Sequence, residues 1–133
     1  MAEPYDGKLI LIVDDDTDIL GAIEAVFKEK GATILTATDG NAAVNMALDK
    51  KPDLLILDAM LPQRSGFLVL EKLKGKKPLG SKPYVVMITA NTGKRHQQWA
   101  ESLGADGYIN KPFRMDRLSE TVEKLLAKDT AKG

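Results

Sequence analysis

The sequence contains no cysteine, a single histidine and a single tryptophan in 133 residues. Without cysteine the chain forms no disulfide bond and no thiolate metal site, which fits the reducing cytoplasm. No apolar run approaches the roughly 20 residues that cross a membrane. The polar start, MAEPYDGK, lacks the apolar stretch of a secretory signal. We therefore expect a cytoplasmic protein that does not enter a membrane.

An excess of charge is also missing, because 19 basic residues balance 19 acidic ones. This balance gives no support to direct nucleic-acid binding or to attachment to an anionic membrane through a broad basic patch. A content of 44% hydrophobic and 29% charged residues is typical of a globular protein. The length suits one domain, so we expect residues 1–133 to form a single domain whose core runs from about residue 8 to about residue 128.

The sequence does have five short apolar runs, each followed by a helical pattern. The runs are LILIV (9–13), TILTA (33–37), LLIL (54–57), YVVMIT (84–89) and GYIN (107–110). Their Ile, Val and Leu content, without alternation, is typical of parallel strands covered on both faces. Apolar residues at spacings of three and four predict helices over about 17–30, 41–50, 67–74, 95–103 and from 115 onward. Asp16 or Thr17 is expected to cap the first helix, and the five lysines between Lys72 and Lys82 are expected to lie in a solvated loop.

Five strands alternating with five helices predict an α/β fold with an open, doubly wound parallel sheet. Ligands of such sheets bind outside the carboxyl ends of the strands. The ends of four of the five runs carry polar residues. They are Asp14, Asp15 and Asp16 after the first run, Asp58 after the third, Thr89 at the end of the fourth and Lys111 after the fifth. If these ends meet, the sheet edge carries several carboxylates, a hydroxyl and an ammonium.

Such crowding of carboxylates has a chemical consequence. Two unit charges about 4 Å apart repel by roughly 4 kcal/mol at an effective dielectric constant near 20. The cluster therefore raises a carboxyl pKa or recruits a cation, and all-oxygen ligands suit Mg²⁺. An aspartate can also act as a nucleophile and form an aspartyl-phosphate. A lysine and a threonine nearby would then stabilise the phosphoryl oxygens.

Four segments together resemble the receiver domain of bacterial two-component response regulators of the chemotaxis-regulator type. They are LILIVDDDTDIL, DLLILDAMLPQRSG, VVMITA and GADGYINKPF, in the family's order and spacing, and the similarity extends from about Lys8 to Lys128. The resemblance implies a flavodoxin-like fold with five helices and a sheet in the order 2-1-3-4-5. One departure lies in the loop that reads Pro62-Gln63-Arg64-Ser65-Gly66, where many relatives carry an acid.

The resemblance also implies roles for individual residues. Asp58 is the implied phosphoacceptor, with Thr89 and Lys111 as catalytic partners. Thr89 and Tyr108 are the implied switch pair. The implied Mg²⁺ ligands are Asp14, Asp15, Asp58 and the main-chain carbonyl of Met60. The bond between Lys111 and Pro112 is implied to be cis.

The resemblance implies a signalling switch and not an enzyme, because the domain assists only its own phosphorylation and dephosphorylation. The phosphoryl donor would be a sensor histidine kinase or a phosphotransfer protein. The fourth helix, fifth strand and fifth helix would contact a downstream protein or a second copy of the chain, without direct nucleic-acid or membrane binding. The apolar Met60 would hinder water from approaching the phosphoryl group in line, so slow self-dephosphorylation is expected.

Other interpretations of the same residues stay open at this point. Asp58 taken alone would be a strand-end residue that accepts backbone hydrogen bonds. Taken alone, Thr89 would be a β-branched strand residue, Tyr108 a half-buried strand aromatic and Lys111 an exposed lysine. The chain could be a receiver-like binding module that works without phosphorylation. A phosphatase of the haloacid dehalogenase type also uses acids after a first strand, but the fifth position of its signature is Asp18 here and a cap domain has no room.

Overall fold

The structure is a computed structural model that describes residues 5–75, 82–90 and 93–132. Its strands are β1 (Leu9–Val13), β2 (Thr33–Ala37), β3 (Leu54–Asp58), β4 (Tyr84–Thr89) and β5 (Gly107–Asn110). Its helices are α1 (Thr17–Glu29), α2 (Gly40–Lys50), α3 (Gly66–Lys74), α4 (Lys94–Ser102) and α5 (Met115–Lys132). All neighbouring strands are parallel and the order is β2-β1-β3-β4-β5. The doubly wound, flavodoxin-like fold is thus confirmed.

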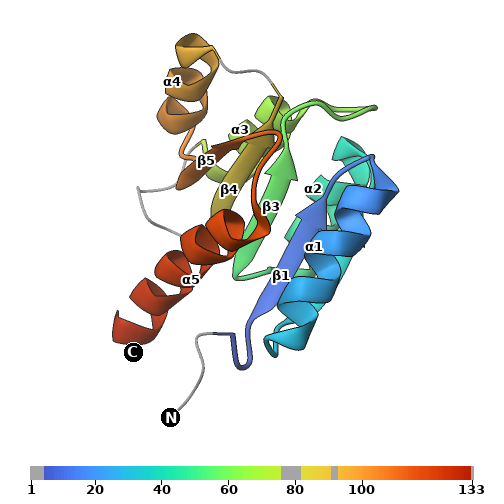
Figure 1. Cartoon of the computed structure of the whole chain (residues 1–133). Helices are drawn as coiled ribbons and strands as arrows, with labels where there is room; N and C mark the ends of the chain where they lie inside the picture. Colours follow the sequence, from blue (N-terminus) through green and yellow to red (C-terminus); the bar gives the residue numbers. More distant parts are fainter. Residues whose placement is uncertain (1–4, 76–81, 91–92, 133) are drawn as a thin grey trace.

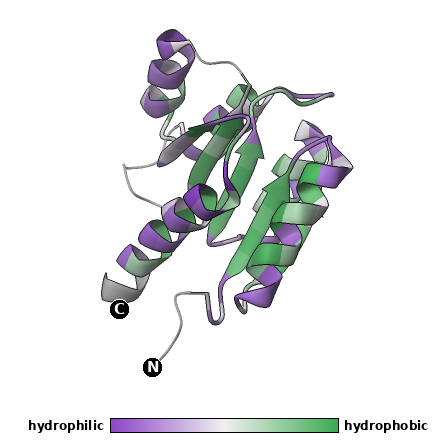
Figure 2. Cartoon of the chain, in the orientation of Figure 1, coloured by the Kyte–Doolittle hydropathy of each residue, from purple (hydrophilic) through white to green (hydrophobic). Residues whose placement is uncertain are grey.

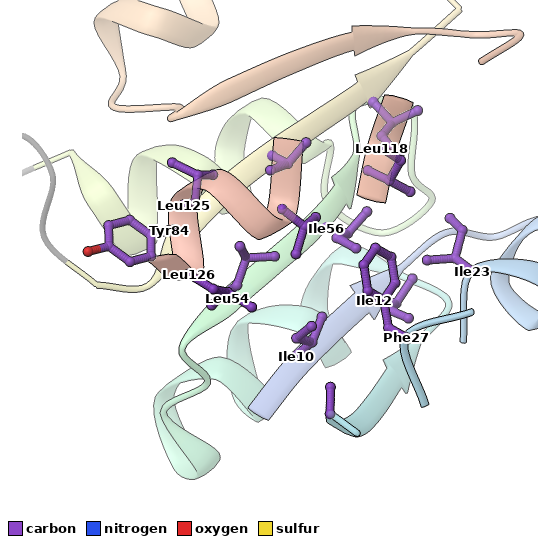
Figure 3. Close-up of a cluster of buried hydrophobic side chains, with 14 of the residues drawn as sticks. Ile10, Ile12, Ile23, Phe27, Leu54, Ile56, Tyr84, Leu118, Leu125 and Leu126 are labelled. Atoms are coloured by element: carbon purple, nitrogen blue, oxygen red, sulfur yellow. The ribbon is translucent and has the colours of Figure 1, made fainter. Parts of the chain in front are cut away.

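The sheet lies between two layers of helices, and its residues alternate between them (Figure 1). Ile10 and Ile12 of β1 pack with α1 and α5, whereas Leu11 and Val13 pack with α2, α3 and α4. Figure 3 shows the first of these clusters, in which Phe27 of α1 contributes a fully buried ring. Burial on both faces explains why the strands contain consecutive apolar residues, since each such side chain contributes about 1.5–3 kcal/mol when buried.

The hydropathy of the helices follows the same division (Figure 2). The central strands β1, β3 and β4 are hydrophobic along most of their length and β5 is mixed, whereas the helices carry hydrophilic residues on the side away from the sheet. Within the described residues, α4 buries only Ala100, which makes it the helix least anchored in the core. Its single tryptophan, Trp99, stacks on Phe67 of α3 with ring centroids 4.4 Å apart.

Side-chain caps fix the starts of three helices at the carboxyl-end edge of the sheet. Asp16 caps α1 by accepting hydrogen bonds from the amides of Asp18 and Ile19, so Asp16 and not Thr17 is the capping residue. Asp39 caps α2 and Ser65 caps α3 in the same way. Each cap satisfies an amide that the helix leaves unpaired at its first turn. The predicted boundaries agree with the helices to within one or two residues, apart from the last, whose end was not predicted.

One expectation about the lysines between Lys72 and Lys82 is wrong. Lys74 is buried in the last turn of α3, where its ammonium lies 3.0 Å from an Asp106 carboxylate oxygen and 3.0 Å from the carbonyl oxygen of Pro83. Burying a lysine side chain is costly unless its donors are paired, and these two acceptors are partners for it. Lys76 and Lys77 lie outside the described residues.

Candidate functional site

The register of the sheet brings the predicted site residues to one edge. Val13 pairs with Leu57, so Asp14 and Asp58, which each follow one of these residues, are neighbours. Asp58 in turn pairs with Ile88, next to Thr89. The amide of Lys111 donates to the carbonyl oxygen of Thr89 at 2.7 Å, which ties the loop after β5 to the end of β4. The parallel strands therefore deliver these side chains to one place, as the strand-end argument predicts.

The centre of this edge is an acidic pocket formed by Asp14, Asp15 and Asp58, whose carboxylate oxygens lie within 4.8 Å of one another. Asp14 and Asp58 are 1% and 4% exposed, whereas Asp15 is exposed. The ammonium of Lys111 lies 3.1 Å from Asp14 Oδ2 and 3.3 Å from Asp58 Oδ2. One ammonium thus faces two buried carboxylates and a third acid beside them.

Burial is the main cause of a raised pKa at Asp58, which is about 6. The Asp14 charge raises this pKa further, while hydrogen bonds from the Met60 amide and from Lys111 oppose the rise. Burial alone would lower the pKa of Lys111, but its hydrogen bond to Asp14 and the charges of Asp58 and Asp14 outweigh burial and raise it. Negative charge in the pocket is therefore only partly compensated by the chain itself.

This donor set fits a hard divalent cation. Three carboxylates at one solvent-accessible edge supply the few oxygen ligands that Mg²⁺ takes from proteins while it keeps several waters. Three carboxylates face a single lysine ammonium here, and a divalent cation would neutralise the remaining negative charge. The residues present are thus compatible with Mg²⁺.

Main-chain contacts hold each buried carboxylate in a fixed orientation. Asp58 Oδ1 accepts from the Met60 amide at 3.0 Å, and Asp14 Oδ1 accepts from the Asp16 amide at 2.9 Å. The remaining oxygen of each carboxylate faces Lys111. Gly66 packs on the backbone behind Asp58, and its amide donates to the Ala59 carbonyl oxygen at 2.9 Å. The loop after β3 therefore orients the Asp58 carboxylate.

The two predicted switch residues lie at different depths. Thr89 is buried at the end of β4, beside the acidic pocket. Tyr108 is half-buried on β5 opposite Met87, two residues before Thr89 along β4, so it lies short of the edge. It packs against the cluster under α2, α3 and α4, and burial raises the pKa of its hydroxyl. The structure thus brings Thr89 to the carboxylates and leaves Tyr108 outside their cluster. The peptide bond between Lys111 and Pro112 is cis, as the resemblance implied.

A first test of the pocket's charge is the stability of Asp58→Asn in EDTA. The folded pKa of Asp58, about 6, lies above the ordinary value of about 3.9, so the wild type loses stability as pH rises between these values. Asn carries no charge, so we expect urea denaturation at about pH 7.5 to show a gain of about 2–3 kcal/mol, at 1.36 kcal/mol per pKa unit.

Asp16→Asn is the matched control, because Asn caps a helix about as well as Asp and this side chain is exposed. It should leave stability unchanged. The gain of Asp58→Asn should shrink as pH falls through about 4 and vanish at about pH 3, where Asp58 is neutral in both folded and unfolded wild type. Equal stability of Asp58→Asn and wild type at about pH 7.5 would contradict the electrostatic account of the pocket.

A sheet in the order 2-1-3-4-5 with an acidic pocket at its carboxyl edge is the arrangement that the resemblance to receiver domains implies, and comparisons identify the family. Residues 10–123 match the response regulator receiver domain family. The chain therefore belongs to this family, whose members are the signalling phosphoacceptors of two-component systems. The pocket formed by Asp14, Asp15 and Asp58 fits the family's phosphorylation site.

Two curated relatives are transcriptional regulatory proteins. The chain is 34% identical over 119 residues to the alkaline phosphatase synthesis transcriptional regulatory protein PhoP of Bacillus subtilis. This match covers 90% of this chain and 48% of PhoP. The chain is also 34% identical over 123 residues to the transcriptional regulatory protein KdpE of Mycobacterium tuberculosis, which covers 92% of this chain and 53% of KdpE. The chain thus spans about half the length of these relatives.

Solved structures agree over nearly the whole chain. The receiver domain of the Francisella response regulator 1452 has a TM-score of 0.84 and 26% identity, and the match covers 92% of this chain and 99% of that one. A CheY-like response regulator receiver domain protein from Methanospirillum hungatei JF-1 has a TM-score of 0.85 and 28% identity, covering 95% of this chain and 98% of that one. No helix among the described residues has the length and apolar character that crossing a membrane requires.

Proposed function

We propose that Asp58 is the phosphoacceptor of a signalling switch. The observation that carries this proposal is the placement of its buried carboxylate at the end of β3, with one oxygen held by the Met60 amide and the other facing Lys111. A carboxylate oxygen attacks the phosphorus, the bond from phosphorus to the donor's leaving atom breaks, and the leaving group keeps that electron pair. With a kinase as donor, the leaving atom is a histidine ring nitrogen.

The chain's own residues stabilise the transferred group. Lys111 loses part of its attraction to Asp58 as the carboxylate becomes an acyl phosphate, and its ammonium then pairs with a phosphoryl oxygen. Thr89, at the neighbouring strand end, donates its hydroxyl to another phosphoryl oxygen. Asp14, Asp15, Asp58 and the Met60 carbonyl would hold Mg²⁺, which supplies positive charge against the phosphoryl oxygens. Phosphoryl transfer is then a matter of positioning and charge neutralisation, and the chain performs no reaction on another substrate.

The response to phosphorylation follows from a shift between two packings. Thr89 moves toward the phosphoryl group and Tyr108 turns inward, where the core already covers part of its ring. The surface of α4, β5 and α5 then changes its affinity for a downstream protein or for a second copy of the chain. The slight burial of α4 supports its role as the element that shifts, because weakly packed elements rearrange at low cost.

We place this switch in the cytoplasm, where sensor histidine kinases or phosphotransfer proteins donate the phosphoryl group. The balance of 19 basic and 19 acidic residues supports protein partners over nucleic acid or membrane.

The test is ¹⁵N NMR of the protein before and after acetyl phosphate and Mg²⁺. We expect new amide positions for Thr89 and Tyr108 and a shifted indole signal for Trp99, all absent from Asp58→Asn. Phosphorylation at Asp58 without any change in α4 or β5 signals would refute the switch. An absence of phosphorylation altogether would favour a module that binds partners without it.

The lifetime of the phosphoryl group should depend on Met60, whose side chain is 66% exposed beside the acceptor. An apolar side chain there hinders a water molecule that approaches the phosphorus in line. Met60→Asn should therefore shorten the lifetime by about tenfold, equivalent to 1.4 kcal/mol of activation free energy. Decay of the trapped phosphoprotein after removal of the donor measures this rate.

Met60→Leu is the matched control, because it keeps an apolar side chain of similar size. Its decay rate should stay within about twofold of the wild type. A decay rate in Met60→Asn that equals the wild-type rate would show that this position does not control access of water.

A further inference from the structure

The loop that carries Met60, residues 59–65, rests on the first turn of α2. The amide of Gly40 donates to the carbonyl oxygen of Pro62 at 3.1 Å. The same carbonyl accepts from the Arg64 amide at 2.7 Å, so one oxygen joins the loop to itself and to α2. Residues far apart in the sequence thus make a direct backbone contact between α2 and the loop that follows β3.

This contact requires that residue 40 has no side chain. A Cβ at Gly40 would overlap the Arg64 carbonyl oxygen, and it would lie 2.6 Å from Arg64 Cβ and 2.7 Å from the Arg64 carbonyl carbon. A real Cβ essentially never lies closer than 3.0 Å to such atoms, and two of these three belong to backbone that cannot rotate away. Gly40 is the first residue of a helix and is buried, so a need for unusual backbone angles does not explain the glycine. The close approach of the loop does.

The opposite end of the loop is held in a similar way. Gly66 lies against the backbone of Asp58 and Ala59, with its hypothetical Cβ 2.6 Å from Ala59 Cα. Between the two glycines, Gln63 adopts a positive φ of 68°, which is uncommon for a residue with a side chain. The loop is therefore clamped at both ends, and Met60, whose amide orients the Asp58 carboxylate, lies between the clamps.

We propose that Gly40 is a positioning residue for phosphoryl transfer, because the first turn of α2 supports the loop that orients Asp58 and presents the Met60 carbonyl. This inference rests on the proposed function of Asp58. A methyl group at residue 40 would push Arg64 and Pro62 away from α2. The displacement would pass along the loop to Met60, lengthen the hydrogen bond from its amide to Asp58 and displace the carbonyl that would bind Mg²⁺.

The test is Gly40→Ala, with Gly21→Ala as the matched control. A Cβ at Gly21, in the middle of α1, would meet nothing within 4 Å, so that variant changes a helical glycine without a clash. In metal-free Gly40→Ala we expect hydrogen exchange of the Met60 amide to be faster by about tenfold or more. We expect the Mg²⁺ dissociation constant, from NMR titration with Mg²⁺ alone, to rise by about tenfold. Gly21→Ala should change neither quantity.

A purely structural role would lower the melting temperature and leave these two local quantities unchanged. The proposal is overturned if Gly40→Ala is less stable than the wild type but stays within about twofold of it in Met60 amide exchange and in Mg²⁺ affinity. If Gly40→Ala does not fold, Asp39→Ala replaces it, because that variant removes the cap of α2 without adding an atom near the loop. It should weaken Mg²⁺ binding by about threefold, and an unchanged affinity overturns the proposal.

The outcome for Asp58 is separable from the outcome for Gly40. If the wild type is not phosphorylated but Gly40→Ala still alters Met60 exchange without metal, the support by α2 is real and the proposed function fails. If the wild type is phosphorylated by acetyl phosphate and Gly40→Ala matches it in rate, in Mg²⁺ affinity and in Met60 exchange, only the inference about Gly40 fails.

Discussion

Replacing Asp58 with asparagine is expected to lower phosphorylation by acetyl phosphate at least about 100-fold, because the amide is a far weaker nucleophile than the carboxylate. The fold should survive, since Asn has the same shape as Asp. Its side-chain amide oxygen can still accept the hydrogen bond that the Met60 amide donates to Asp58. Incorporation of the phosphoryl group, followed by intact-protein mass spectrometry at saturating Mg²⁺, measures the loss.

Asp16→Asn is the control for this loss, because Asp16 belongs to the same acidic stretch but caps α1. Its phosphorylation should stay within about twofold of the wild type. A wild-type rate in Asp58→Asn would mean that another residue accepts the phosphoryl group. Equal losses in both variants would mean that net charge at the edge, and not a particular nucleophile, sets the rate.

The largest effect on stability is expected for Asp106→Ala. Asp106 Oδ2 accepts from the ammonium of Lys74 at 3.0 Å and from the amide of Val85 at 2.8 Å. The Asp106 side chain is 13% exposed and the Lys74 side chain is 1% exposed. The variant therefore leaves the buried ammonium of Lys74 without its carboxylate and the Val85 amide without its acceptor. Such a loss costs about 3–5 kcal/mol of unfolding free energy. Urea denaturation at neutral pH measures it.

An exposed ion pair in the same chain provides the comparison. Lys124 and Glu120 lie 3.2 Å apart on α5 with side chains 74% and 69% exposed. Glu120→Ala should therefore cost less than about 0.5 kcal/mol. Lys74→Met removes the buried charge itself and should cost less than Asp106→Ala. A cost below about 1 kcal/mol for Asp106→Ala would show that water reaches Lys74 and screens its charge.

Much of the fold follows from local features of the sequence. Consecutive apolar residues such as Leu54 to Leu57 indicate a strand buried on both faces, and the structure has one there. Parallel strands end at one edge of the sheet, so the strand ends correctly predicted that Asp14, Asp58, Thr89 and Lys111 lie together. The order of the strands did not follow from local features, since periodicity does not encode which strands are neighbours. That order came from resemblance to a family.

What the sequence did not reveal depends on contacts between distant residues. Lys74 lies in a lysine-rich stretch and looked solvated, and only the fold shows that Asp106 and Pro83 surround it. Nothing in the sequence distinguishes Gly40, and its close approach to Arg64 is visible only when the loop after β3 is placed. Sequence patterns report which face of an element is apolar, but they do not report which backbone lies against it.

The central claim is that the buried strand β3 presents Asp58 as the phosphoacceptor. The most direct measurement is to treat the protein with acetyl phosphate and Mg²⁺, reduce the acyl phosphate with borohydride and map the reduced residue by peptide mass spectrometry. We predict homoserine at position 58 only, and no product when EDTA is present. Homoserine at Asp14 or Asp15, or no reduced residue while wild-type protein is folded and binds Mg²⁺, would contradict the account.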